Sequence, residues 1–169
     1  GDDDPSGYYP CDALGEAGHR LHERAIVRDD KYAMRALVSR WIADGGVDGI
    51  IATGGTGFTG RDSTPEALLP LLDKEMPGFG ELFRAISFED IGTSTLQSRA
   101  FAGLANATFL FALPGSTSAC RTGWDCQAAW CGRCSFCKGC VGQRRVGWIS
   151  SWGLKLRPSA SSWQYLINC

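Results

Sequence analysis

A glycine-rich loop that ends in a carboxylate constrains the fold of this chain more than any other feature. Residues 53–62 read Thr-Gly-Gly-Thr-Gly-Phe-Thr-Gly-Arg-Asp, with Asp62 as the last residue. The apolar residues at 47–51 before the loop are typical of a strand that is covered on both faces. Ser63 and the Thr-Pro-Glu sequence after it predict the start of a helix. The sequence therefore predicts a loop between a strand and a helix.

Such a loop is suited to hold a phosphate group. Its four glycines allow a backbone with positive φ and leave no Cβ in the way, so unpaired N–H groups can point at an anion. The loop is not a Walker A motif, because no lysine follows its last glycine. The alternative, an ordinary strand-to-helix turn without a ligand, stays open on the motif alone.

Strands and helices are expected to alternate along the chain. Apolar spacing predicts a helix with one buried face, which includes Trp41 as a core residue. The other expected elements are strands at 21–27 and 108–113, helices at 65–72 and from Ser94 to about 104, and a loop at 76–80. The alternation favours an α/β fold, three layers deep, with a mostly parallel sheet between helices. Ligands bind beyond the carboxyl ends of such strands, where we expect Asp29, the loop at 53–62 and the turn at 114–117 to meet.

Charge and composition change abruptly after Asp125. Of the 17 basic residues 11 lie up to Asp125 and 6 after it, whereas all 18 acidic residues lie up to Asp125. Six of the eight cysteines and four of the six tryptophans also follow Asp125. We therefore expect one domain at 1–125 and an atypical Cys- and Trp-rich basic tail at 126–169 that lies outside the fold.

The sequence also indicates where the protein acts. The uncharged stretch at 100–120 is interrupted by Asn106, Pro114 and Gly115, so it cannot span a bilayer. The basic residues of the tail are scattered and form no nucleic-acid-binding module. We expect a cytoplasmic protein that binds neither membrane nor nucleic acid.

A series of short motifs runs along residues 2–125. They are Asp4-x-Ser6-Gly7, Asp29, Thr53-Gly54-Gly55-Thr56-Gly57, Asp62, Thr64-Pro65-Glu66, Met76-Pro77-Gly78-Phe79-Gly80-Glu81, Ser98-Arg99 and Pro114-Gly115-Ser116. Their order closely resembles the MoaB/MogA family of molybdenum cofactor biosynthesis proteins. The run at 92–99, Gly-Thr-Ser-Thr-Leu-Gln-Ser-Arg, resembles the MoaB branch of that family.

The resemblance implies a molybdopterin-binding fold and, in active members, transfer of AMP from Mg-ATP to the molybdopterin phosphate with release of pyrophosphate. By position, Asp62 and Asp29 match the two functional aspartates, which would hold Mg²⁺ beside the phosphates. For Asp29, a helix N-cap is the alternative role. The substrate-binding positions would be Thr53, Gly54, Gly55, Thr56, Gly57 and Ser116.

The resemblance also bears on partners. The family is generally trimeric or a dimer of trimers, so we expect a homo-oligomer that works with other molybdenum cofactor biosynthesis proteins. A molybdopterin-binding protein without adenylyl transfer is the alternative function.

The chain departs from the family pattern at both ends. Family members begin with a hydrophobic strand before the Asp-x-Ser-Gly segment, and this sequence shows no such strand. We therefore expect the sheet to lack a central strand and the chain not to be fully stable or active. After Trp124 and Asp125 the family pattern continues with an amphipathic helix, whereas residues 141–169 show no sustained helical or strand periodicity.

The tail contains four cysteines at equal spacing, Cys131, Cys134, Cys137 and Cys140. One interpretation is an iron–sulfur or zinc site, which would make the protein a metal-binding accessory. The other, which we favour, is translation out of frame, since GC-rich DNA read in another frame yields Cys, Trp, Gly, Arg and Ser without acidic residues.

Overall fold

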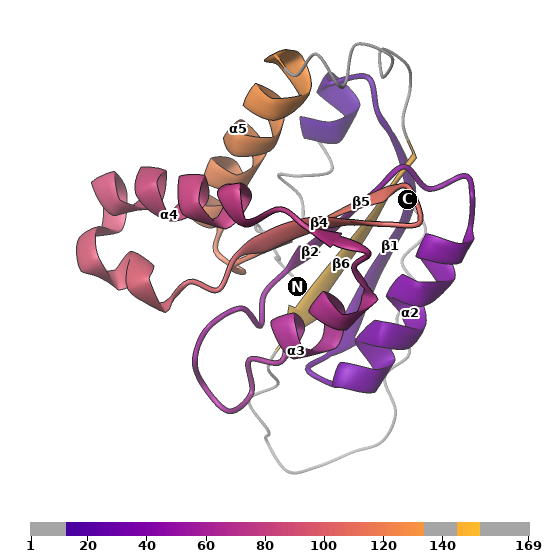
Figure 1. Cartoon of the computed structure of the whole chain (residues 1–169), viewed down its shortest axis with the longest axis horizontal. Helices are drawn as coiled ribbons and strands as arrows, with labels where there is room; N and C mark the ends of the chain where they lie inside the picture. The colour runs from indigo at the N-terminus through magenta and orange to yellow at the C-terminus, as the bar shows by residue number, and fades with distance from the viewer. Residues whose placement is uncertain (1–12, 134–144, 153–169) are drawn as a thin grey trace, which may run out of the picture.

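The computed structural model describes the backbone of residues 13–133 and 145–152. Its centre is a sheet of six strands that is covered by helices on both faces (Figure 1). Helices α4 (Pro77–Ile91) and α5 (Thr117–Arg133) lie on one face, and α2 (Lys31–Ala43) and α3 (Thr64–Leu68) lie on the other. The expected three-layer α/β fold is confirmed. None of the described helices is both long and apolar enough to cross a bilayer.

The sheet is mostly parallel. Its strands, in spatial order, are β1 (Arg20–Arg28), β6 (Arg145–Trp152), β2 (Gly49–Thr53), β5 (Thr108–Leu113), β4 (Phe101–Ala105) and β3 (Lys74–Glu75). The first four strands run parallel, whereas β4 pairs antiparallel with β5 and β3 pairs antiparallel with β4. Two 3₁₀ helices, η1 (Leu69–Leu71) and η2 (Gly92–Gln97), and a helical segment at 13–16 are also described.

Both faces of the central strands are buried, which explains their unbroken apolar sequences. On β5, Phe111 and Leu113 pack against α4 and α5, while Leu110 and Ala112 face α2 and α3. Trp41 of α2 is 1% exposed and lies in the second of these cores, as the sequence predicted.

Strand β6 differs most from expectation. Residues 145–152 belong to the segment that was expected to lie outside the fold, yet they pair with β1 on one side and with β2 on the other. The expected boundary at Asp125 falls inside α5. No alternation revealed this strand because it is buried on both faces: Trp148 packs towards α5, and Ile149 packs towards α2. The place between β1 and β2 is thus filled by residues from late in the chain.

Two local predictions are wrong. The helix expected from Ser94 to about 104 is instead η2 followed by β4. Pairing of β4 with β5 decides this, since the strand gains main-chain hydrogen bonds and buries Ala102 and Ala105. The expected loop at 76–80 is the first turn of α4, which begins at Pro77, a position where a proline needs no hydrogen-bond partner.

Candidate functional site

The glycine-rich loop begins where β2 ends and is held against the end of β5. The N–H of Gly54 donates to the carbonyl of Leu113 at 2.9 Å, and Gly54 and Gly55 have φ of 91° and 63°. A Cβ on Gly115 would lie 3.2 Å from Gly54 Cα. The turn at 114–116 therefore packs directly on the loop, and glycine at 115 permits this close approach.

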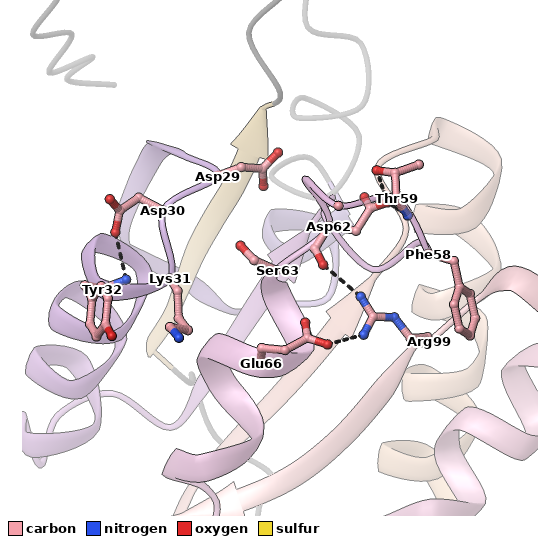
Figure 2. Close-up of a pocket in the computed structure, with 11 residues that line it drawn as sticks. Asp29, Asp30, Lys31, Tyr32, Phe58, Thr59, Asp62, Ser63, Glu66 and Arg99 are labelled. Carbon is pink, nitrogen blue, oxygen red and sulfur yellow. Dashed lines mark hydrogen bonds and ion pairs between the residues drawn. The ribbon is translucent and has the colours of Figure 1, made fainter.

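Asp29 and Asp62 line the same open pocket, which has a volume of about 580 Å³ (Figure 2). Asp29 follows β1, and Asp62 ends the loop that follows β2. The sequence predicted that Asp29, the loop at 53–62 and the turn at 114–117 would share one site. Asp29 and the loop residues 58–60 and 62 line this pocket, whereas the turn does not. Besides Asp29 and Asp62, the lining residues are Asp30, Lys31, Tyr32, Phe58, Thr59, Gly60, Ser63, Glu66 and Arg99.

Asp62 is fixed by its own loop. Its Oδ2 accepts hydrogen bonds from the N–H and the hydroxyl of Thr59, at 2.7 and 2.6 Å. A Cβ on Gly57 would lie 2.8 Å from the same oxygen, so only glycine leaves room for the carboxylate. Partial burial raises the pKa of Asp62, but the hydrogen bonds from Thr59 and Gly57 and the charge of Arg99 outweigh it and lower the pKa overall. Asp62 is therefore ionised at neutral pH.

The neighbouring Asp30, rather than Asp29, caps helix α2. Asp30 Oδ1 accepts hydrogen bonds from the N–H groups of Tyr32 and Ala33, at 2.8 and 2.9 Å. These two bonds lower the pKa of Asp30. Asp30 therefore occupies the N-cap position of α2. Asp29 does not have the N-cap role that the sequence left open as its alternative.

Arg99 is a site residue for which the sequence predicted no role. Its Nε donates to the carbonyl of Gly57 and its Nη2 to the carbonyl of Asp62, both at 2.8 Å. Its Nη1 pairs with the carboxylate of Glu66 on α3 (Figure 2). No local pattern could reveal these contacts, because the partners lie 33 to 42 residues away in the chain.

Two exposed aromatic side chains flank the pocket, each beside a cation. Tyr32 is 69% exposed and Phe58 is 71% exposed. Lys31 Nζ lies 5.0 Å from the ring centroid of Tyr32, and Arg99 Cζ lies 5.4 Å from that of Phe58. The pocket thus offers planar surfaces as well as charge.

Ser116 lines a second, smaller pocket of about 100 Å³ instead of the first. Its hydroxyl accepts a hydrogen bond from the N–H of Ala119 at 3.1 Å, at the start of α5. The wall is rich in hydroxyl groups, which come from Ser87, Thr95, Ser98, Ser116, Ser118 and Thr122. Ser98 and Arg99 are consecutive but line different pockets, so the two pockets are close neighbours. Thr53 and the loop residues 54–57 line neither pocket.

The described residues contain no cluster of three or more His, Cys, Asp or Glu side chains that could hold a metal ion. Cys134, Cys137 and Cys140 lie outside the described residues, as does the side chain of Cys131. The cysteine interpretation therefore stays a prediction.

Comparison with known proteins agrees with the motifs. Molybdenum cofactor biosynthesis protein B of Escherichia coli K12 is 60% identical to this chain over 124 residues, which cover 73% of each protein. A family model described as a probable molybdopterin binding domain matches residues 2–129. The chain belongs to the MoaB/MogA family. The resemblance that the motifs indicated is therefore confirmed, and protein B of Bacillus subtilis, 44% identical over 119 residues and 70% of each protein, is a further relative.

Solved structures of this MoaB/MogA family share the fold. A crystal structure of molybdenum cofactor biosynthesis protein B has a TM-score of 0.73 and 42% identity, covering 79% of this chain and 84% of that one. The tungsten cofactor synthesizing protein MoaB from Pyrococcus furiosus has a TM-score of 0.69 and 38% identity, with coverage of 76% and 81%.

Proposed function

We propose that this MoaB/MogA-family protein acts in molybdenum cofactor biosynthesis, where it binds molybdopterin and transfers AMP to its terminal phosphate from Mg-ATP. The observation that carries the proposal is that Asp29 and Asp62, from two different strand ends, line one pocket beside a glycine-rich loop. The proposal includes a homo-oligomer in the cytoplasm, as expected from the resemblance.

The reaction exchanges one phosphoanhydride bond for another. An oxygen of the molybdopterin phosphate attacks the α-phosphorus of ATP, and a new P–O bond joins AMP to the pterin. The bond between the α-phosphorus and the bridging oxygen to the β-phosphate breaks, and pyrophosphate leaves with that electron pair. Such a transfer needs positioning and charge neutralisation more than covalent help from the protein.

The donor set of the pocket suits Mg²⁺. Carboxylate oxygens are ligands that Mg²⁺ prefers, and it commonly takes only one or two from protein, the others coming from phosphates and water. Asp62 and Asp29 would hold the ion, which when bound would neutralise phosphate charge. Arg99 and Lys31 are the cations among the lining residues and would bring positive charge to opposite sides of the pocket (Figure 2).

The glycine-rich loop would hold the terminal phosphate of the pterin. The backbone N–H groups of Gly55 and Thr56 would be the donors to this anion, since the N–H of Gly57 is hydrogen-bonded to Asp62. The hydroxyl-rich pocket with Ser116 adjoins the loop through Gly115 and would take the polar pterin. On this proposal the two substrates lie on either side of the loop.

The test is pyrophosphate release from Mg-ATP in the presence of molybdopterin, with wild type, Asp62→Asn and Asp29→Asn. We expect each variant to lose at least about 100-fold in rate, since neutralising a carboxylate at a charged centre typically costs a few kcal/mol. Asp44→Asn is the control because Asp44 lies outside the pocket, and it should match wild type. Unchanged adenylyl transfer in Asp62→Asn would contradict the assignment.

A molybdopterin-binding protein without adenylyl transfer remains the second proposal. It predicts that wild type binds molybdopterin but releases no pyrophosphate although both aspartates are intact.

A further inference from the structure

We propose that Arg99 is a positioning residue, which clamps the loop segment 57–62 and thereby holds the carboxylate of Asp62 in place. The catalytic effect of this clamp, on Mg²⁺-dependent adenylyl transfer, rests on the proposed function. Its structural part, the clamping of the loop, can be tested without any activity.

Arg99 joins the two ends of the loop segment. Its Nε donates to the carbonyl of Gly57, where the segment begins, and its Nη2 donates to the carbonyl of Asp62, where it ends, both at 2.8 Å. The main-chain N–H of Arg99 also donates to the carbonyl of Thr56 at 3.0 Å. One residue, located just before β4, thus fixes three carbonyls of a loop that begins after β2.

The clamp determines where the Asp62 carboxylate lies. Arg99 holds the main chain of Asp62, and Thr59 holds its side chain through two hydrogen bonds to Oδ2. A further hydrogen bond, from the N–H of Asp62 to the carbonyl of Thr59 at 2.9 Å, closes the turn between them. If the carbonyls of Gly57 and Asp62 were released, the carboxylate would keep its bonds to Thr59 but lose its fixed position relative to β2.

Only a guanidinium can make this clamp. Its planar fork presents Nε and Nη2 side by side and binds two acceptors at once, whereas a lysine ammonium is a point charge on a flexible stem. The Arg99 side chain is 25% exposed, so its donors are largely withdrawn from water. The carboxylate of Glu66, on α3, balances the charge of Arg99. The hydrogen bond from Arg99 in turn lowers the pKa of Glu66. Replacement by lysine therefore separates the clamp from the charge.

The chain offers a matched control in Arg35 of α2. Its Nε donates to the carbonyl of Ala67 at 2.9 Å and its Nη2 to the carbonyl of Glu66 at 2.7 Å, so it binds two main-chain carbonyls through the same pair of donors. Arg35 does not line the pocket. Arg35→Lys removes the same type of hydrogen bonds outside the loop.

The first measurement is amide hydrogen exchange of the full-length protein without ligands. The N–H groups of Thr59 and Asp62 are hydrogen-bonded inside the loop, so their exchange reports its opening. In Arg99→Lys we expect exchange at these two amides to become about tenfold faster, because the variant loses one or two hydrogen bonds that hold the loop closed. In Arg35→Lys we expect their exchange to stay unchanged. Equal exchange in Arg99→Lys and wild type would overturn the clamp.

The second measurement is the Mg²⁺ concentration that gives half-maximal adenylyl transfer. Loss of a group that orients a metal ligand typically costs 10- to 100-fold in metal affinity or activity. We expect Arg99→Lys to require about tenfold more Mg²⁺ while KM for molybdopterin stays the same. If Arg99→Lys behaves as wild type here and Arg99→Gln does not, Arg99 acts through its charge and the positioning role is wrong. If wild type shows no transfer, the proposed function fails, and the exchange experiment still decides whether Arg99 clamps the loop.

Discussion

Gly147 of β6 lies directly against the indole ring of Trp41 on α2. A Cβ at position 147 would be 2.8 Å from Cε3 of that ring, closer than real Cβ contacts come. The ring cannot easily move away, because Trp41 is 1% exposed and its Nε1 donates to Glu23 Oε2 at 2.8 Å. Strand β6 therefore packs closely against helix α2, although the two elements lie far apart in the sequence.

Gly147→Ala should destabilise the protein by about 1–3 kcal/mol, the usual cost of adding a methyl group to a filled core. Urea unfolding measures the change in the free energy of unfolding. Gly49→Ala on the adjacent strand β2 is the control, because its Cβ would meet nothing closer than 3.8 Å. Equal stability of Gly147→Ala and wild type would mean that β6 does not pack against Trp41.

Gly57→Ala should impair the proposed adenylyl transfer more than stability. The new Cβ would lie 2.8 Å from Asp62 Oδ2 and push the carboxylate out of place, which we expect to lower kcat about 100-fold. Gly60→Ala, in the same loop, places its Cβ where nothing lies within 4 Å and should reduce kcat far less. Steady-state kinetics and thermal unfolding of both variants check this, and equal kcat values would contradict it.

Glu23 should make stability depend on pH in the acid range. Partial burial raises its pKa, but the hydrogen bonds from Arg40 and Trp41 outweigh this and lower the pKa overall. Folding is therefore favoured by the charged carboxylate, and this contribution is present above the ordinary pKa near 4.5 and is lost as the pH falls through the lower folded value. Glu23→Gln should be less stable than wild type at pH 7 by about 1 kcal/mol, since the group is partly exposed to water.

The check is urea unfolding of both proteins between pH 2 and 7. The difference between them should shrink as the pH falls below about 4. A difference that stays constant over this range would show that the Glu23 charge contributes nothing.

Ala107→Gly should stabilise the protein. Asn106 and Ala107, in the turn between β4 and β5, have φ of 45° and 62°, a left-handed backbone that alanine adopts at a cost. Ala107 is exposed, so glycine loses no packing, and we expect a gain of about 0.5–1 kcal/mol. Ala36→Gly, an exposed position in the interior of α2, should have the opposite sign and cost about 1 kcal/mol. Thermal unfolding of the two variants would reveal the opposite shifts.

Local sequence patterns predicted the elements whose structure is decided by neighbouring residues in the chain. The strand at β5 carries an unbroken apolar run, α2 has a regular buried face, and the loop at 53–62 has glycines between a strand and a helix. The same reasoning placed Asp29 and Asp62 at one site, because strand ends in a parallel sheet meet at one edge. Their shared pocket confirms that step.

The features that the sequence did not predict depend on distant partners. Strand β4 becomes a strand because β5 pairs with it, and β6 because two strands and two helix layers enclose it. Arg99 gains its role from carbonyls on another loop. In each case the deciding contact is made in three dimensions, between residues that no window of sequence contains.

The position of β6 sets an order of events in folding. Strands β1 and β2 follow each other closely in the chain, yet neither pairs with the other, since β6 lies between them. During synthesis on the ribosome, β1 and β2 would both emerge with unpaired edges and could not complete the sheet before residues 145–152 are made. Pairing between segments so far apart in the sequence slows folding. During that interval the unpaired edges of β1 and β2 expose main-chain N–H and C=O groups to which strands of other chains can bind.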